Sequence, residues 1–393
     1  MDEVRNPFAP GAGTQPPELA GRDGIISEAR IALQRAVRGR SSRSQMLLGL
    51  RGVGKTVLLN RIQEMAEDED HLTSFIEAPE SNRIVDLLYP RLVQVLRKLS
   101  TTERARASAH SGMRALRSFA SAFKIEIGDI SLSVDPESGT ADSGNLEFDL
   151  SDLFLKIGEA AKSAGRAWTL LIDEVQYLSS DDLSALIVAL HRANQKALPI
   201  LFFGAGLPQA AALSGEAKSY AERLFTYPTV GALNAADAQA AIRGPVEEEG
   251  ETITDDAIRN IVVKTQGYPY FLQEWGYQVW NTADASPISG DDVDTASVDA
   301  IRRLDEGFFR VRFDRLTPKE RDYVICMAEL GSGPYRSGDV AERMGEKVTS
   351  LGPTRSSIIR KGMIYSPSHG DIDFTVPLFA DYLHRTREID CGA

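Results

Sequence analysis

A glycine-rich loop between two apolar segments constrains the fold of this 393-residue chain more than any other feature. Residues 49–56 read GLRGVGKT and match the pattern G-x-x-x-x-G-K-[ST] in full. The apolar run before the loop predicts a buried strand, and the amphipathic segment after it predicts a helix. Glycines let the loop amides turn inward on phosphate oxygens, and the start of the helix adds its positive dipole end. The loop therefore predicts nucleotide binding; the alternative is a glycine-rich strand–helix turn with an incidental lysine.

The loop pattern also assigns roles to its last two residues. Lys55 would neutralise the β- and γ-phosphates, and the Thr56 hydroxyl would ligate Mg²⁺. We therefore predict ATP or ADP as the ligand and Mg²⁺ as the cofactor. The predicted nucleotide contacts along the loop are Gly49, Arg51, Gly52, Val53, Gly54, Lys55, Thr56 and Val57.

Nucleotide hydrolysis also needs a carboxylate for the metal and a base that orients the attacking water. The segment WTLLIDEVQYL, residues 168–178, supplies both groups at the end of a predicted strand. We assign Asp173 to Mg²⁺ and Glu174 to the base, and we count Lys55 with Glu174 as catalytic. Without the upstream loop, such an Asp-Glu pair would be read as a strand end that meets solvent.

Apolar strands that alternate with helices predict a parallel sheet covered by helices on both faces. We assign residues 21–229 to this α/β domain, with an insertion of helix and β-hairpin at about 97–150. The hairpin is predicted over 123–134, where apolar and polar residues alternate on both sides of a Gly-Asp turn. Residues 1–20 contain four prolines and are predicted to form an extended arm.

After about residue 229 the strand signal stops, and short amphipathic segments predict a helical lid domain over 230–290. Residues 291–393 are predicted to hold a linking helix and a winged-helix domain. Its first helix opens with Thr317, Pro318 and Glu320, which match a capping box with proline at the first helical position. Two further helices, over 337–345 and from Pro353 to 362, and a pair of strands over 363–376 complete this prediction.

Several short motifs occur in the order found in one family. They are LAGRD (19–23), GLRGVGKT (49–56), LLIDEVQ (170–176), GAGLP (204–208), YAERLF (220–225) and GYPYFLQ (267–273). In this order they resemble AAA+ ATPases of the origin-recognition type, closest to prokaryotic members that border the STAND NTPases. The predicted winged helix extends the resemblance over most of the chain.

The resemblance implies further site residues. Gly21, Arg22 and Asp23 would lie beside the adenine. Arg223 matches the arginine that reaches the γ-phosphate of a neighbouring subunit, which would make hydrolysis depend on assembly into a homo-oligomer. A solvated surface charge is the alternative for this arginine. Pro269 matches a Gly-x-Pro pattern of STAND proteins, in which the proline packs near the base.

The chain departs from the family pattern in two places. Residues 203–205 are Phe-Gly-Ala where many members have a polar residue that senses the γ-phosphate. Residues 267–270 are Gly-Tyr-Pro-Tyr where many members have a second sensor arginine. Both changes remove groups that would stabilise developing charge. We therefore expect slow turnover and a protein that acts as a nucleotide-dependent switch.

The third helix of a winged helix is the one that can enter the major groove of double-stranded DNA. Its predicted exposed candidates for DNA contact are Thr354, Arg355, Ser357, Arg360 and Lys361. Because charges in this module are nearly balanced, a protein-docking role is the alternative.

The basic segment 91–124, which has eight Lys or Arg and one acid, is a second candidate surface for phosphate contacts. A solvated helical face is the alternative.

Composition limits the remaining choices. The net charge is −12, no apolar run is long enough to span a membrane, and the two cysteines lie far apart in the sequence. We expect a cytoplasmic protein without membrane partners. The sequence thus predicts a DNA-associated ATPase switch. The alternatives are a STAND-like signalling NTPase whose winged helix docks protein or inhibits the enzyme, and, less well supported, a small-molecule phosphotransferase.

Overall fold

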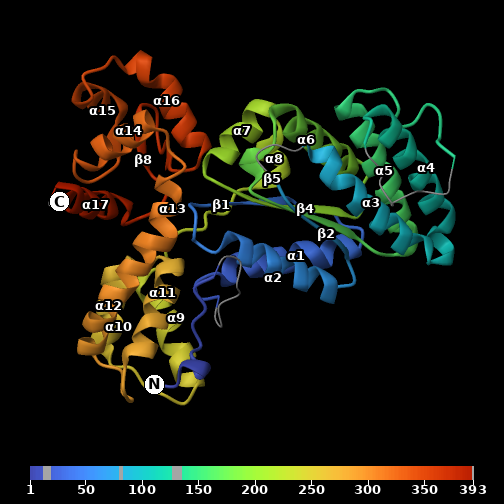
Figure 1. Cartoon of the computed structure of the whole chain (residues 1–393). Helices are drawn as coiled ribbons and strands as arrows, with labels where there is room; N and C mark the ends of the chain where they lie inside the picture. Colours follow the sequence, from blue (N-terminus) through green and yellow to red (C-terminus); the bar gives the residue numbers. More distant parts are fainter. Residues whose placement is uncertain (12–18, 79–82, 126–134, 392–393) are drawn as a thin grey trace. The chain divides into compact units, whose positions relative to one another are not determined.

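The computed structural model describes residues 1–11, 19–78, 83–125 and 135–391. It divides into two compact units (Figure 1). The sheet unit comprises residues 23–49 and 55–230. The C-terminal unit comprises residues 1–22, 50–54 and 231–393, so that it includes the middle of the glycine-rich loop.

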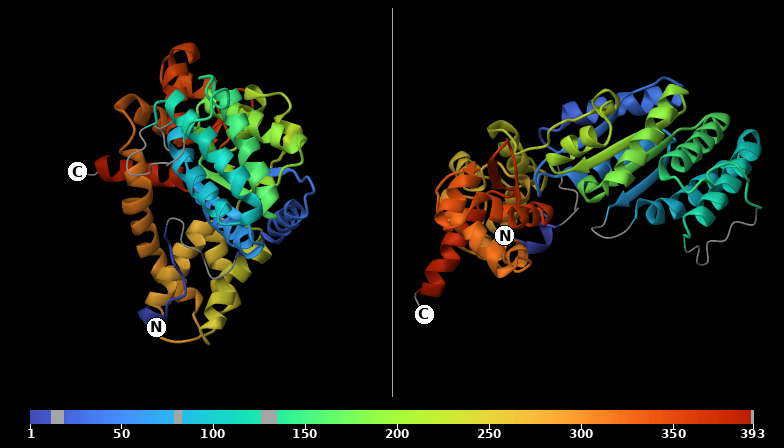
Figure 2. Two further views of the ribbon diagram at one scale, coloured as in Figure 1. Left: turned by 90° about the vertical axis from the view of Figure 1, so that its right-hand side faces the viewer. Right: turned by 90° about the horizontal axis from the view of Figure 1, so that it is seen from above.

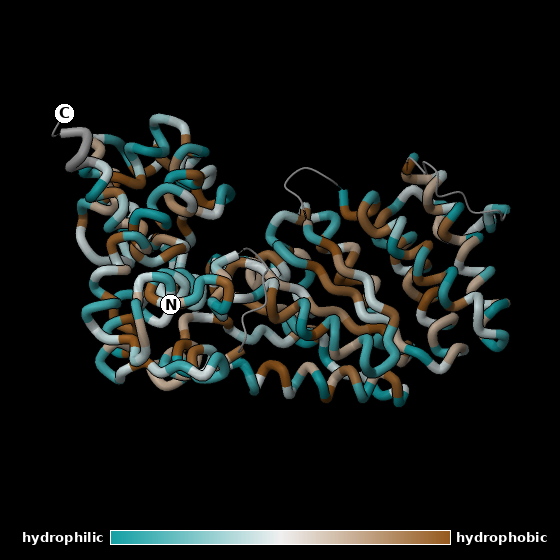
Figure 3. Tube along the Cα trace, turned by 60° about the horizontal axis from the view of Figure 1, so that its bottom comes forward, coloured by the Kyte–Doolittle hydropathy of each residue, from teal (hydrophilic) through white to brown (hydrophobic). Residues whose placement is uncertain are grey.

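The sheet unit contains a five-stranded parallel sheet in the order β2-β3-β4-β1-β5 (Figure 2). Its strands are β1 (Ser44–Leu48), β2 (Leu72–Glu77), β3 (Trp168–Asp173), β4 (Ile200–Gly206) and β5 (Phe225–Thr226). Every residue of β1 and β3 is buried, which is why these strands read as continuous apolar runs. The apolar colouring follows the strands in Figure 3.

Helices cover both faces of this sheet, as predicted (Figure 1). The helices of the unit are α1 (Asp23–Val37), α2 (Lys55–Asp68), α3 (Ile84–Ser100), α4 (Arg106–Ala122), α5 (Leu146–Ala164), α6 (Ser180–Gln195), α7 (Gln209–Ala217) and α8 (Ala221–Leu224). Helices α1 and α2 lie on one face, and α6 and α7 lie on the other. Helix α3 continues through Pro90. The predicted hairpin over 123–134 falls mostly outside the described residues.

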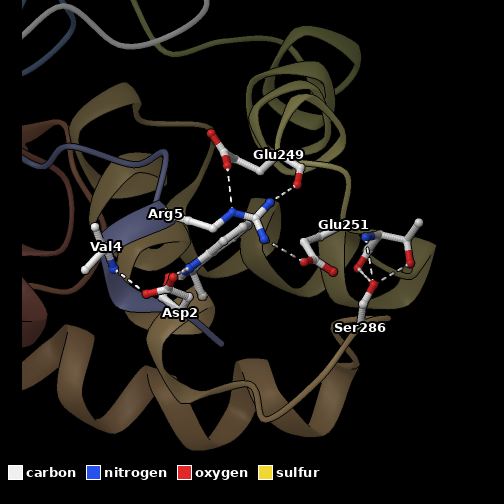
Figure 4. Close-up of polar contacts among 8 residues, drawn as sticks. Asp2, Val4, Arg5, Glu249, Glu251 and Ser286 are labelled. Atoms are coloured by element: carbon white, nitrogen blue, oxygen red, sulfur yellow. Dashed lines mark hydrogen bonds and ion pairs between the residues drawn. The ribbon is translucent and has the colours of Figure 1, made fainter.

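The C-terminal unit begins with a bundle of α9 (Ala235–Glu248), α10 (Asp255–Thr265), α11 (Pro269–Thr282) and α12 (Gly290–Arg303). A π-helical turn (Leu304–Phe309) and α13 (Arg310–Phe313) extend α12. Residues 1–11 pack on this bundle. Arg5 forms ion pairs with Glu249 and Glu251 (Figure 4). Phe8 is buried against Gly276.

The last part of the C-terminal unit combines helices with a small antiparallel sheet of order β6-β8-β7. Its elements are α14 (Pro318–Ala328), β6 (Tyr335–Arg336), α15 (Ser337–Arg343), α16 (Val348–Arg360), β7 (Ile364–Tyr365), β8 (Asp371–Phe374) and α17 (Phe379–Cys391). The predicted capping box at Thr317 and Glu320 is confirmed. Strands β7 and β8 were predicted, whereas β6 was not.

None of the described helices is long and apolar enough to cross a membrane.

Candidate functional site

The glycine-rich loop joins the carboxyl end of β1 to the first residue of α2. Gly49 N–H donates to the Gly206 carbonyl oxygen at 3.1 Å, which fixes the start of the loop beside β4. Gly52 and Gly54 have φ values of +81° and +90°, a backbone region that glycine adopts without a steric penalty. Lys55 is buried at the start of α2. The loop therefore has the turns that direct amides inward in a phosphate-binding loop.

Asp173, the last residue of β3, is only 4% exposed and meets the start of α2. Its Oδ2 accepts a hydrogen bond from Thr56 Oγ1 at 2.5 Å, and its Oδ1 accepts one from the Glu174 N–H at 2.8 Å. Burial raises the pKa of Asp173 and the Glu174 carboxylate adds to the rise, while the Thr56 hydroxyl and Lys55 oppose it. The structure thus brings together the two side chains that the sequence assigned to Mg²⁺.

Glu174 follows directly and has a left-handed backbone, with φ at 55° and ψ at 40°. Non-glycine residues adopt this region at a cost, and such strain concentrates at functional sites. Its Oε2 accepts a hydrogen bond from Gln176 Nε2. Gln176 Oε1 in turn accepts from the Leu207 N–H at 3.0 Å. Sequence reasoning missed Gln176, because a polar residue after a strand end gives no signal of a contact 31 residues away.

The middle of the glycine-rich loop, residues 50–54, belongs to the C-terminal unit. There it contacts Tyr268, the N-cap residue of α11, and Tyr270 in the first turn of α11. The Tyr270 N–H donates to the Gly52 carbonyl oxygen at 3.2 Å, and the Tyr268 hydroxyl donates to the Arg51 carbonyl oxygen. A Cβ at Gly52 would lie 3.1 Å from Tyr268 Cε1. Pro269 is the first residue of α11, between the two tyrosines. Burial raises the pKa of Tyr268, so its hydroxyl stays protonated and able to donate.

The predicted adenine-side residues are Gly21, Arg22 and Asp23. Arg22 is buried and donates to the carbonyl oxygens of Val53, at 3.3 Å, and of Gly231. Burial lowers the pKa of Arg22, and nearby Asp237 opposes the change. A Cβ at Gly21 would collide with Asp237, so this turn requires glycine. Within the C-terminal unit, the structure therefore places Arg22 against the loop. Asp23 is exposed at the start of α1.

Arg223 lies on the short helix α8 and is exposed. Within the part of the chain that the structure describes, no acidic side chain forms an ion pair with it. The structure leaves its guanidinium available, but it does not bring this group to Lys55 or Glu174.

The five candidates for DNA contact lie on α16 and just after it, and here the structure differs from the expectation. Arg360 is exposed, but Thr354, Arg355, Ser357 and Lys361 are half-buried. Arg355 Nη1 donates to Ser337 Oγ at 3.0 Å, and Lys361 Nζ lies 2.6 Å from Glu320 Oε2. The reason is that α16 packs on α14 and α15, which cover part of this face.

Comparisons with known proteins agree with this architecture. Residues 18–203 match the AAA ATPase domain family, and residues 306–383 match a domain of unknown function, DUF8462. The Walker-type ATPase PABY2304 of Pyrococcus abyssi is similar at 16% identity and a TM-score of 0.60, over 94% of this chain and 97% of that chain. No curated protein matches this chain.

Two further solved structures are similar over most of their length. The ORC1 protein of Aeropyrum pernix, solved in complex with DNA, has 13% identity and a TM-score of 0.48, over 96% of each chain. The RuvB Holliday junction branch migration motor of Thermotoga maritima has 15% identity and a TM-score of 0.46, over 92% of this chain and 95% of that chain. Residues 18–203 thus match the AAA ATPase domain family, and the five-stranded parallel sheet has the AAA+ P-loop fold.

Proposed function

We propose that this protein is a cytoplasmic molecular switch that binds ATP with Mg²⁺, hydrolyses it slowly, and associates with double-stranded DNA through its C-terminal unit. The observation that carries the nucleotide part is the 2.5 Å contact between the Thr56 hydroxyl and the Asp173 carboxylate at the end of a phosphate-binding loop. The proposal of slow turnover follows from the residues around this contact. The DNA part rests on separate features of the C-terminal unit.

The oxygen atoms of Thr56 and Asp173 suit Mg²⁺, which prefers hard oxygen donors. These two residues would hold the ion, and a bound ion would neutralise charge on the phosphates. Lys55 and the loop amides would bind the β- and γ-phosphate oxygens. Glu174 would take a proton from the attacking water as the water oxygen bonds to the γ-phosphorus and the bond to the ADP oxygen breaks.

Slow turnover is supported by what surrounds the base. Gln176 already donates to Oε2 of Glu174, so this oxygen is less available to the attacking water. The end of β4 offers Gly204, Ala205 and Gly206, which have no polar side chain to stabilise a developing charge. If exposed Arg223 acts on the nucleotide of another copy, fast hydrolysis requires a homo-oligomer.

We propose that residues 317–376 form a winged helix with α16 as the DNA-contacting helix. Three helices and a three-stranded antiparallel sheet in this order support that proposal. Of the five candidates, exposed Arg360 is best placed to contact a phosphate. In this scheme ATP binding closes the bundle of α9–α12 as a lid over the AAA ATPase domain, with Pro269 near the adenine base of the nucleotide.

A STAND-like switch with a protein-docking or autoinhibitory winged helix is the second candidate. The intramolecular contacts of Arg355 and Lys361 favour it, because side chains held by Ser337 and Glu320 are less available to phosphates. The two candidates share the nucleotide site and differ in the partner of α16.

The test uses the purified full chain with radiolabelled ATP, Mg²⁺ and duplex DNA. The parent should bind ATP and hydrolyse it well below about 10 turnovers per second, a common enzyme value. Lys55→Ala should abolish ATP binding, whereas Glu174→Gln should bind ATP and lose hydrolysis. Lys156→Ala serves as a matched control, because this lysine pairs with Glu137. A parent that binds no ATP contradicts the proposal.

The DNA part is tested with Arg360→Ala. Loss of DNA retention with intact ATPase activity supports DNA contact through α16. Retention equal to the parent would show that Arg360 is not a DNA contact, and a parent that binds no DNA supports the second candidate.

A further inference from the structure

An arginine-rich surface in the sheet unit has no part in the proposed nucleotide site. Residues 30–43 contain five arginines and no acidic residue, in a chain whose net charge is −12. The structure exposes all five, and none forms an ion pair with a carboxylate among the described residues. They lie on the second half of α1 and on the loop before β1. They are Arg30, Arg35, Arg38, Arg40 and Arg43.

This arginine surface adjoins a groove of about 370 Å³. The groove lies at the amino ends of β1 and β5, whereas Asp173 and the glycine-rich loop are at the carboxyl ends of the strands. Arg35 and Arg43 line it together with the hydroxyl groups of Ser41 and Ser42. Arg35 Nε donates to Ser42 Oγ at 3.1 Å, which orients this guanidinium along the wall of the groove.

Two polar atoms in the groove lack a partner. Gln45 is only 3% exposed, and its Oε1 has no hydrogen-bond partner in the described part of the chain. The same holds for Oγ1 of Thr226, which pairs in register with Gln45 across the β1–β5 ladder. A buried polar atom without a partner costs about 1–3 kcal/mol. Both residues line the groove, but these two atoms are themselves enclosed, so a ligand can pair with them only when the side chains turn toward it.

We propose that this surface binds the phosphate backbone of double-stranded DNA and that the groove receives one backbone phosphate. Guanidinium groups hold phosphate oxygens through paired hydrogen bonds, and serine and threonine hydroxyls are frequent backbone donors. A Gln45 side chain turned toward the groove can donate from Nε2 to a phosphate oxygen. Glu28 is the one acidic lining residue, and Arg35 and Arg43 outnumber it.

An acidic protein segment is a poorer fit to the same surface. Protein interfaces depend on aromatic and other large apolar anchors, and no aromatic residue lines the groove. A phosphate backbone needs no such anchor and presents charges in a row, which suits five arginines spread over α1 and the following loop. The inference rests on the proposed function only for DNA as the partner, because α16 lies in the other unit.

The test measures binding of a fluorescent duplex of about two helical turns to the full chain by anisotropy at several salt concentrations. Arg38→Ala/Arg40→Ala/Arg43→Ala should weaken binding at least about tenfold and lower the slope of log affinity against log salt by up to about three. The control Lys162→Ala/Arg259→Ala/Arg303→Ala removes equal charge from exposed positions outside residues 30–43, residues 91–124 and α16. It should bind like the parent.

A second variant removes the polar side chain of Gln45, which lines the groove, without changing the charge of the protein. Gln45→Leu should weaken DNA binding severalfold while its melting temperature stays equal to or above that of the parent. Parent-like binding by both Gln45→Leu and the triple variant of Arg38, Arg40 and Arg43 overturns the inference. An equal loss of binding in the charge control also overturns it. Equal affinity for polyglutamate also overturns it, because the surface would then bind acidic protein. If only Arg360→Ala weakens DNA binding, the inference fails and the proposed function stands.

Discussion

Gln176 links Glu174 to the end of β4: its amide nitrogen donates to Glu174 Oε2, and its oxygen accepts from the Leu207 N–H at 3.0 Å. An amide N–H that donates to a carboxylate oxygen makes that oxygen less available to the proton of an attacking water. The proposed base is therefore restrained by its own sequence neighbour. Through Leu207, Gln176 is also tied to the end of β4. In many members of the family that the sequence resembles, this strand end carries the polar residue that senses the γ-phosphate.

We expect Gln176→Ala to raise basal ATP turnover. A hydrogen bond to a charged group contributes about 1.5–3 kcal/mol, and half of that released in the transition state is close to a tenfold rate change. The KM for ATP should stay within about twofold, because Gln176 contacts Glu174 and not Lys55 or Thr56. Steady-state kinetics measures both values. A fall in turnover would show instead that Gln176 positions Glu174 for catalysis.

Gly206→Ala should act in the same direction by a steric route. A Cβ at this position would lie 2.9 Å from Gln176 Oε1 and 3.1 Å from the Ala210 Cβ, so Gln176 has to move. The matched control is Gly215→Ala on α7, where a Cβ meets nothing within 4 Å. Turnover should rise in the first variant only. Equal turnover in both would mean that the Gln176 contact does not restrain Glu174.

Thr56→Val should lose Mg²⁺-dependent hydrolysis by about a hundredfold or more, because the hydroxyl that meets Asp173 is gone. It should also lower the free energy of unfolding by about 1–3 kcal/mol, since a buried acceptor loses its donor. Thr56→Ser keeps the hydroxyl and is the control. Activity across Mg²⁺ concentrations and urea unfolding check both effects. A Val variant as active as the Ser variant would contradict the assigned role.

Strands β1, β3 and β4 and the glycine-rich loop could be predicted from sequence, because burial on both faces forces apolar runs, whereas the two-residue strands β5 and β6 were missed. The contact of Asp173 with Thr56 could also be predicted, since parallel strands bring the carboxyl end of β3 to the same edge of the sheet as the loop after β1. These inferences need only periodicity and the ordering rules of parallel sheets.

Other features depend on tertiary contacts that periodicity does not carry. The start of α16 at Val348 was missed because proline was taken as the first helical residue, whereas Pro353 lies within the helix. The contact of Gln176 with Leu207 and the packing of Phe8 on Gly276 join positions far apart in the chain. The groove beside Gln45 likewise forms only when β5 pairs with β1.

Gly52→Ala and Gly54→Ala separate backbone strain from crowding within the loop. Both positions have positive φ, so each alanine costs about 1–3 kcal/mol in backbone strain. At Gly52 the new Cβ also lies 3.1 Å from Tyr268 and 3.3 Å from Tyr270, whereas at Gly54 it meets nothing within 4 Å. Gly52→Ala should therefore lower the melting temperature more. Equal shifts in a thermal melt would mean that the tyrosines do not restrain Gly52.

Lys361 is expected to act on stability, which would confound its use in a DNA-binding test. Burial tends to raise the pKa of Glu320, but hydrogen bonds from Lys361, Ser357 and Thr317 hold it at about 2. Because this value lies below the ordinary 4.5, the interaction stabilises fully above that pH and is lost as pH falls toward 2. Lys361→Ala should thus lower the free energy of unfolding at neutral pH by about 1–3 kcal/mol. Urea unfolding at pH 7 and about pH 3 should show this deficit shrinking at the lower pH. Arg360→Ala should unfold like the parent at both values, and a Lys361 deficit independent of pH would exclude the ion pair as its cause.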